Sequence, residues 1–206
     1  MIQINLEVPK GRSLEKLEAH LPAGALNIEP SFSARLKTLV LKTHAGSLHS
    51  KSTSFSSLNT HLESHAGSIH GFYSVGNDLR AVASSGSVHL DLYFNADNKP
   101  EGNARVEAST HAGIVKVRLA AENYYAVDAS YSTSAGSLDI IYPDVFQGPI
   151  EIESKVGSVK LHGEDLKIIS RVKRVTGEVI KAFKGQHKTG SIVESTNAGS
   201  AKLRFE

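Results

Sequence analysis

One short phrase recurs along the whole chain and constrains its fold more than any other feature. It reads Thr-His-Ala-Gly-Ser-Leu at residues 43–48 and Ser-His-Ala-Gly-Ser-Ile at residues 64–69. Aligned copies place a glycine every 19 to 27 residues, at Gly24, Gly46, Gly67, Gly86, Gly113, Gly136, Gly157, Gly177 and Gly199. Such a nearly fixed period indicates a repeat architecture, in which each unit buries its apolar face against its neighbours.

The columns around the glycine alternate with period two. The position two residues after the glycine is apolar in all nine copies, the next is polar in eight, and the one after is apolar in six. This alternation is typical of a strand with one buried face. Helical repeats would show a period of 3.6 instead, and none is present.

A hydroxyl column precedes the glycine by three residues. Six of the nine copies have Thr or Ser there: Thr43, Ser64, Thr110, Thr133, Ser154 and Thr196. We expect these hydroxyls to bond to the next rung or to local backbone, and the glycine to supply a positive φ or a close approach at a corner.

These columns predict an all-β fold, a parallel β-solenoid of about nine rungs with repeats of about 20 residues. We expect a single domain over residues 1–206, with residues 1–20 as an N-terminal cap or first rung and residues 21–206 as repeats. A β-sandwich, whose strands also recur at short intervals, is the alternative fold.

Composition narrows the function only by exclusion. The net charge is +2 and cysteine is absent, which excludes disulfides and cysteine metal sites and gives no strong overall field for nucleic acid. The sequence has no signal-peptide pattern and no apolar run long enough to span a bilayer. We therefore predict no nucleic-acid partner, no membrane insertion of this segment and no cofactor.

Histidines suggest a metal or proton site. His49, His70 and His89 occupy one outward column on three successive rungs, where imidazoles about 4.8 Å apart could bind a divalent metal or sense pH. The alternative interpretation is a solvated polar column duplicated along with the repeat.

Tyrosines and one insertion suggest a ligand surface. Tyr73, Tyr93 and Tyr124 belong to adjacent aromatic pairs, in which one ring should point outward and could form a platform for sugar rings. The longest interval between glycines contains Asn95, Asp97 and Asn98 in a polar loop, a second candidate for ligand binding. Core packing of the rings and a tolerated surface loop are the alternatives.

Catalysis on a parallel β-helix would need clustered carboxylates on neighbouring rungs. Asp139 is the only acid in its column, and Glu151 and Glu153 lie on one face of a strand. We assign no catalytic residue. A glycan-active lyase or hydrolase is kept as an alternative function.

The repeated phrase also resembles that of the putative-adhesin β-solenoid domains of bacteria, and is similar to an uncharacterised fungal branch of that group. Residues 71–79, 142–150 and 159–166 carry the closer similarity. The resemblance implies surface adhesion and a cell-surface or extracellular location. Without it, we expect a cytoplasmic location. It implies no catalytic residues.

We therefore expect a non-enzymatic structural or adhesion-type module, with polysaccharide or cell-surface components as partners. A self-assembling scaffold is a further alternative. The last expected rung, residues 193–205, has no obvious cap, so copies could associate through the solenoid ends.

Overall fold

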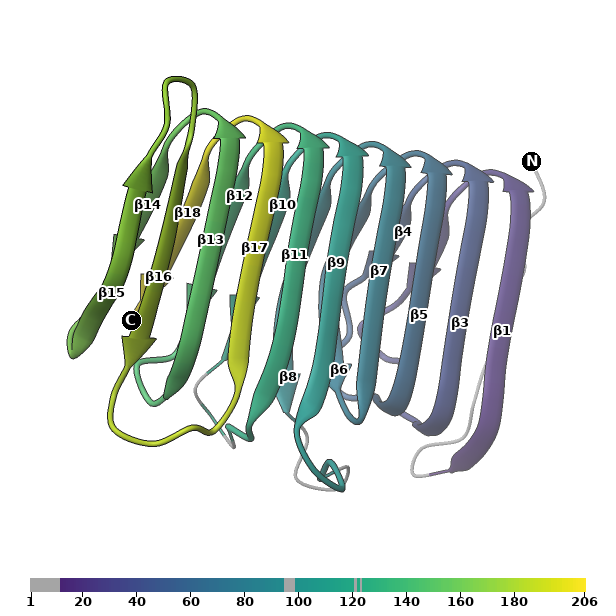
Figure 1. Ribbon diagram of the computed structural model, residues 1–206. Helices are drawn as coiled ribbons and strands as arrows, with labels where there is room; N and C mark the ends of the chain where they lie inside the picture. The colour runs from purple at the N-terminus through teal and green to yellow at the C-terminus, as the bar shows by residue number, and fades with distance from the viewer. Residues whose placement is uncertain (1–11, 95–98, 121, 123) are drawn as a thin grey trace.

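The computed structural model describes residues 12–94, 99–120, 122 and 124–206, which form two facing β-sheets (Figure 1). The described residues contain strands, turns and loops but no helix, and so no helix able to cross a membrane. The all-β prediction is confirmed.

The larger sheet, sheet A, has ten strands, and the smaller sheet, sheet B, has eight. Sheet A contains β1 (Ser13–Ala23), β3 (Arg35–Ala45), β5 (Ser56–Ala66), β7 (Asp78–Ser85), β9 (Ala104–Ala112), β11 (Val127–Ala135), β13 (Gly148–Val156), β15 (Leu166–Lys173), β16 (Glu178–Lys184) and β17 (Ser191–Ala198). Sheet B contains β2 (Leu26–Ile28), β4 (Leu48–Ser50), β6 (Ile69–Val75), β8 (Val88–Phe94), β10 (Val115–Leu119), β12 (Leu138–Tyr142), β14 (Val159–His162) and β18 (Ala201–Phe205).

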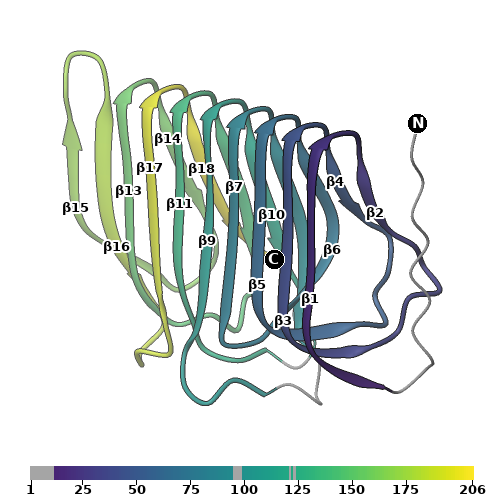
Figure 2. The ribbon, with the colours of Figure 1, turned by 90° about the vertical axis from the view of Figure 1, so that its right-hand side faces the viewer.

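Each turn of the coil joins one strand of each sheet through a glycine corner and then returns by a loop (Figure 2). From β1 to β11 the odd-numbered strands pair in parallel and in chain order, which gives about five turns. Ala45 pairs with both Ala23 and Ala66, as the aligned repeat requires. A parallel β-solenoid is therefore confirmed, and the sandwich alternative is excluded because neighbouring strands are parallel and one turn apart.

The prediction of nine rungs is wrong, because the spatial order departs from the chain order after β12. Strand β17 lies between β11 and β13, and β18 lies between β12 and β14. Strands β15 and β16 form an antiparallel hairpin at the end of sheet A. The Gly177 copy belongs to the turn of that hairpin, where Arg174 N donates to Gly177 O. So short a turn can join only antiparallel strands.

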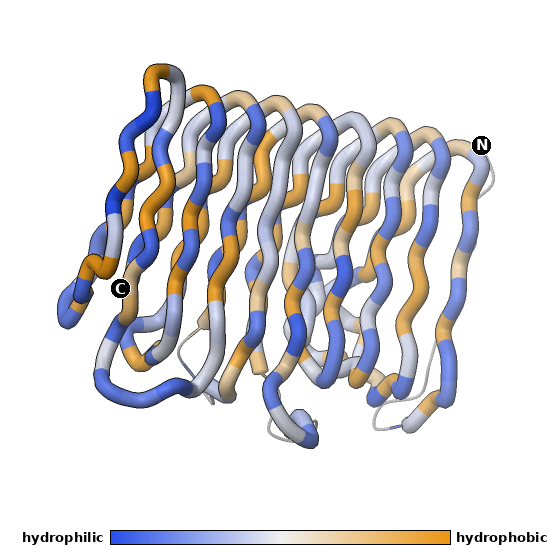
Figure 3. The backbone as a smooth tube through the Cα atoms, viewed as in Figure 1, coloured by the Kyte–Doolittle hydropathy of each residue, from blue (hydrophilic) through white to orange (hydrophobic). Residues whose placement is uncertain are grey.

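The core lies between the two sheets and follows the predicted alternation (Figure 3). In β3, Leu39, Leu41 and Thr43 are buried, while Val40 and Lys42, which alternate with them, are partly exposed. Large rings fill the C-terminal part of the core, where Tyr142, Phe146 and Phe205 pack together. Burial of these apolar surfaces is the main stabilising contribution, as in any solenoid.

The side chains of the hydroxyl column are buried, and all of them have the same kind of hydrogen-bond partner. Each hydroxyl donates to the carbonyl oxygen of the corner glycine on the adjacent rung, at 2.7 Å for Thr110 to Gly86 and 2.8 Å for Ser154 to Gly199. Thr43, Ser64, Thr133 and Thr196 make the same bond to Gly24, Gly46, Gly113 and Gly136. The predicted bond to the next rung is confirmed, and it ties one corner to the next.

Removing one of these hydroxyls should destabilise the fold. Thr110→Val keeps the shape but leaves the Gly86 carbonyl without its hydroxyl donor, so we expect a loss of about 1–2 kcal/mol in the free energy of unfolding. Urea denaturation measures this loss. Ser109→Ala, on the outer side of the same strand, is the matched control and should change stability little.

The corner glycines stack closely on one another. Gly136 has a φ of +150°, and a Cβ added there would lie 1.8 Å from the Gly113 carbonyl oxygen. At Gly199 the corresponding distance, to the Gly136 carbonyl oxygen, is 1.6 Å. No side chain fits at these positions, so the repeat requires glycine for both its conformation and its spacing.

The strand at the edge of sheet A near the C-terminal turns is not the one expected from the sequence. The strands within residues 193–205 are interior to both sheets, and β15 forms the edge instead. Ile168 and Ile169 on β15 are 47% and 65% exposed. At the other end, β1 is the first described strand, whereas residues 1–11 of the predicted cap lie outside the described residues. Association of copies through these ends stays a prediction.

Candidate functional site

The outer face of sheet B is the candidate site, because its first row of side chains is rich in basic groups. This row is the column three residues after each corner glycine. Strand register places its members side by side in the order Asn27, His49, His70, His89, Lys116, Asp139, Lys202 and Lys160. Insertion of β18 next to β14 makes Lys202 and Lys160 direct neighbours.

A second row runs parallel to the first, two residues further along each strand. In spatial order it contains Phe72, Asp91, Arg118, Ile141, Arg204 and His162. Arg204 bridges the two rows through an ion pair of 3.0 Å with Asp139. A hollow in this face is lined by His89, Leu90, Asp91, Lys116, Arg118 and Ile141. We call the two rows together the basic face.

The three histidines form a continuous stack on the basic face. The ring centroids of His49 and His70 are 6.3 Å apart, and those of His70 and His89 are 5.2 Å apart. Partial burial lowers the pKa of His70, and the charges of His89 and His49 lower it further. Partial burial also lowers the pKa of His89, with Lys116 acting in the same direction and Asp91 in the opposite one. These two rings are therefore mostly neutral at neutral pH.

The three histidines of the predicted metal site are neighbours, as expected, but few other metal-ligating side chains accompany them. His49, His70 and His89 are adjacent in pairs, with edge-to-face ring contacts. Across the described parts of the chain, no group of three or more His, Asp or Glu side chains is arranged to hold a metal ion. Lysine rather than carboxylate continues the row beyond His89.

The tyrosines do not meet on one outer surface. Tyr73 is fully buried, and burial raises the pKa of its phenol. The hydroxyl of Tyr93 donates to the Phe55 carbonyl oxygen at 2.6 Å, and the ring of Tyr124 packs against the core at 5.8 Å from Phe94. The outward ring of the first pair is instead Phe72, which is 40% exposed.

The remaining candidates are dispersed. Asn95, Asp97 and Asn98 lie outside the described residues. Glu151 pairs with Lys181 at 3.1 Å, and Glu153 pairs with Arg174 at 2.9 Å, both on the outer face of sheet A. Because each of these two carboxylates is paired with a cation, they do not form a cluster of free carboxylates.

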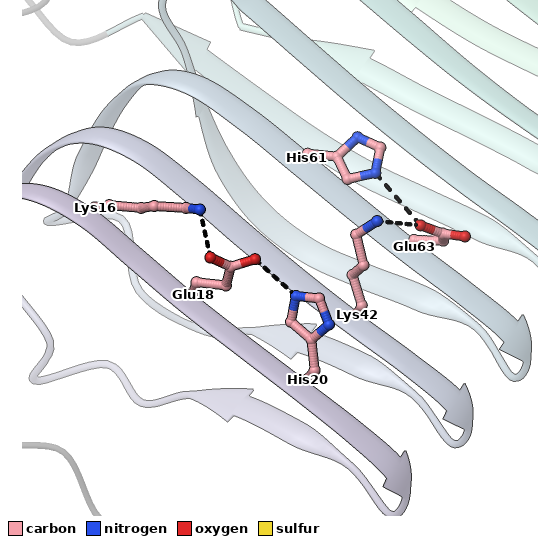
Figure 4. A network of polar contacts seen from close by, with 6 residues as sticks. All are labelled: Lys16, Glu18, His20, Lys42, His61 and Glu63. Carbon is pink, nitrogen blue, oxygen red and sulfur yellow. Dashed lines mark hydrogen bonds and ion pairs between the residues drawn. The ribbon is translucent and has the colours of Figure 1, made fainter.

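The outer face of sheet A carries mostly paired charges, in contrast to the basic face. Figure 4 shows its N-terminal part, where Glu18 contacts Lys16 and accepts a hydrogen bond from the Nε2 of His20 at 2.8 Å. Nearby, Glu63 lies 2.8 Å from Lys42 and 3.4 Å from His61. The Lys42 contact contributes most to holding the pKa of Glu63 low. Cations here are neutralised by their neighbours.

Glu194 is an ionisable residue in the core that the sequence patterns did not single out. It lies on the inner side of β17 with no exposed surface, between Tyr131 and Ile152 of the adjacent strands. Neither carboxyl oxygen has a hydrogen-bond partner among the described residues. Burial, and to a lesser extent the charge of Asp139, raises its pKa to about 8. A signal was present in the sequence: the column five residues before the glycine is otherwise apolar, and Glu194 is its exception.

The fold and the basic face together define an all-β, parallel β-solenoid domain whose sheet B has an outer face rich in basic side chains. The chain belongs to a family described as a domain of unknown function, DUF7330, whose model matches residues 43–201. No curated protein and no solved structure matches it. The family match lends no support to the resemblance to adhesins or to fungal relatives.

Proposed function

We propose that this domain is a non-enzymatic binding module that holds an extended polymer, of the kind found at cell surfaces, along the basic face. The observation that carries the proposal is the unpaired state of its cations. Within the described chain, Lys116, Arg118 and Lys202 make no ion pair, whereas the sheet A cations Lys16, Lys42 and Lys181 do. Unpaired charges gathered on one face are available to a ligand.

A rigid flat sheet also suits adhesion more than catalysis. Glycoside cleavage needs two carboxyl groups facing one bond in a cleft. Glu151 and Glu153 are tied to cations, and Asp139 is tied to Arg204. Glu194 has the raised pKa of a general acid but lies in the closed core, out of reach of a polymer. These features support binding without turnover.

Co-sedimentation with insoluble polysaccharides tests the proposal. We expect the purified chain to sediment with at least one of chitin, β-glucan, cellulose or a cross-linked acidic polysaccharide, with no reducing sugar released into the supernatant. Lys116→Gln together with Lys202→Gln should weaken sedimentation, whereas Lys42→Gln on sheet A should not. Release of sugar would overturn the proposal and favour the glycan-active alternative.

A further inference from the structure

We infer that the polymer is an anionic polysaccharide, held along the row of Lys116, Lys202 and Lys160 and bound more tightly at acid pH, where His70 and His89 add positive charge to the same row. This inference rests on the proposed function and names the ligand class for the same face.

The basic face holds more positive charge than the whole chain. Its two rows contain five Lys or Arg side chains and two Asp, a net charge of +3 with histidine neutral. The complete chain has a net charge of only +2, so the remainder is slightly negative. The modest overall charge therefore conceals a local excess of cations on one side of the solenoid.

Four of the five Lys and Arg side chains of this face make no ion pair within the described residues, and two of them, Lys160 and Lys202, are neighbours of like charge that repel each other. Lys160 and Lys202 are paired across β14 and β18, and in the described parts of the chain neither makes an ion pair. Lys116 and Arg118, exposed on β10, are likewise without one. Only Arg204 is neutralised, by Asp139 and Glu206. An anionic polymer laid along the row would offset this repulsion, whereas a neutral one would not.

The geometry of the row fits a linear chain. Parallel strands lie about 4.8 Å apart, so the row from β4 to β14 is a straight line of roughly 29 Å. A polymer with charges on successive units can contact several of these strands at once. Single-stranded nucleic acid, by contrast, is usually held by stacking on aromatic rings. Phe72 is the one Phe, Tyr or Trp side chain in the two rows, and the neighbouring imidazoles of the histidine stack contact one another edge to face, which favours a polysaccharide.

The histidine stack makes the same face responsive to pH. His70 faces His49 and His89, and His89 faces Lys116 and Asp91. Since burial and neighbouring charges lower the pKa of His70 and His89, these rings gain protons at a lower pH than an ordinary histidine does. Each proton adds a positive charge to the row. A bound polyanion favours that protonation, so by linkage acid pH strengthens binding.

Equilibrium binding to four soluble probes tests the inference: dextran sulfate, polygalacturonate, neutral dextran and a single-stranded oligothymidylate. We expect the two anionic polysaccharides to bind and neutral dextran not to bind. The affinity should fall between about 50 and about 200 mM NaCl, as it does when bound cations are displaced. Dextran sulfate keeps its charge at acid pH, so tighter binding at about pH 5.5 than at about pH 7.5 reports on the protein.

Variants locate the site. Replacing Lys116, Lys160 and Lys202 together with Gln should weaken dextran sulfate binding by about tenfold or more and flatten its salt dependence. The matched triple variant on sheet A, with Gln at Lys16, Lys42 and Lys181, should bind like the unchanged chain. His70→Asn with His89→Asn should remove most of the pH effect, so that the affinities at about pH 5.5 and about pH 7.5 become similar. Circular dichroism confirms that each variant is folded.

The outcomes separate this inference from the proposed function. If the chain sediments only with neutral polysaccharides, and the lysine variants sediment equally well, the inference is overturned and the binding site is not the basic face. The proposal that the domain is a binding module would then still stand. Binding of the oligothymidylate in preference to both anionic polysaccharides would overturn the polysaccharide assignment. If a folded chain binds no polysaccharide of either kind, the proposed function and the inference both fail.

Discussion

Gly136→Ala is expected to prevent the solenoid from folding under conditions in which the unchanged chain is stable. The new Cβ would lie 1.8 Å from the Gly113 carbonyl oxygen, and the backbone φ of +150° is one that L side chains rarely adopt. The clash is with backbone, so no side chain can move to relieve it, and separating the two corners would break the hydroxyl bond from Thr133 to Gly113. We expect a loss of more than about 4 kcal/mol.

A graded glycine series isolates the cause of this loss. Gly24 has a φ of +112° but nothing within 4 Å of an added Cβ, so Gly24→Ala should cost only about 1–3 kcal/mol of backbone strain. Gly102 has open space around it and no positive φ, so Gly102→Ala should be nearly neutral. Thermal unfolding followed by circular dichroism ranks the three. Equal destabilisation of Gly24→Ala and Gly136→Ala would show that stacking of the corners is unimportant.

Glu194→Gln is expected to make the free energy of unfolding much less dependent on pH. In the folded chain the pKa of Glu194 is about 8, whereas in the unfolded chain it is near the model-peptide value of 4.5. Between these values the folded state holds the proton more tightly. The contribution of Glu194 to stability is therefore fully present below about pH 4.5 and is lost as the pH rises to about 8, by several kcal/mol at about 1.4 kcal/mol per pH unit.

Urea denaturation at several pH values between about 5 and 9 measures this effect. The Gln variant cannot ionise, so it should be more stable than the unchanged chain at alkaline pH and similar to it, or slightly less stable, at acid pH. Glu151→Gln removes an exposed carboxylate from the neighbouring strand β13 and should leave the alkaline loss in place. A Gln variant that loses stability as steeply as the unchanged chain above pH 6 would contradict the assignment to Glu194.

Much of the fold could be predicted because the repeat encodes each turn locally. The apolar column after the glycine and the hydroxyl column before it each fix one side chain against its counterpart on the next rung. For that reason Leu48, Ile69 and Val88 were correctly placed inside, and Thr110 correctly given a partner on an adjacent rung. Gly177 was misplaced because a hairpin turn also favours glycine, and the column alone does not distinguish the two uses.

The candidate site was predictable only in part, because it depends on which turns are neighbours. The column of His49, His70 and His89 is visible in the sequence. Lys202 and Lys160 are brought together only by the insertion of β18, and the similar columns of β14 and β18 give no hint of their order. The outward placement of Tyr73 was wrong for another reason. Period two indicates that paired rings face opposite ways, and cannot say which of Phe72 and Tyr73 is inside.

The placement of β17 and β18 has a consequence for how the chain is made. The ribosome synthesises β13 and β14 before β17 and β18. In the folded chain, however, β17 and β18 are the strands that lie next to β11 and β12. β13 shares the hydroxyl and glycine columns of β17, so on leaving the ribosome it meets a vacant edge that it also fits. The final order requires that edge to stay open, or to be reopened, until residues 191–205 emerge. Translation and assembly of this sheet therefore proceed in different orders, and its last turns close only after the hairpin beyond them has been made.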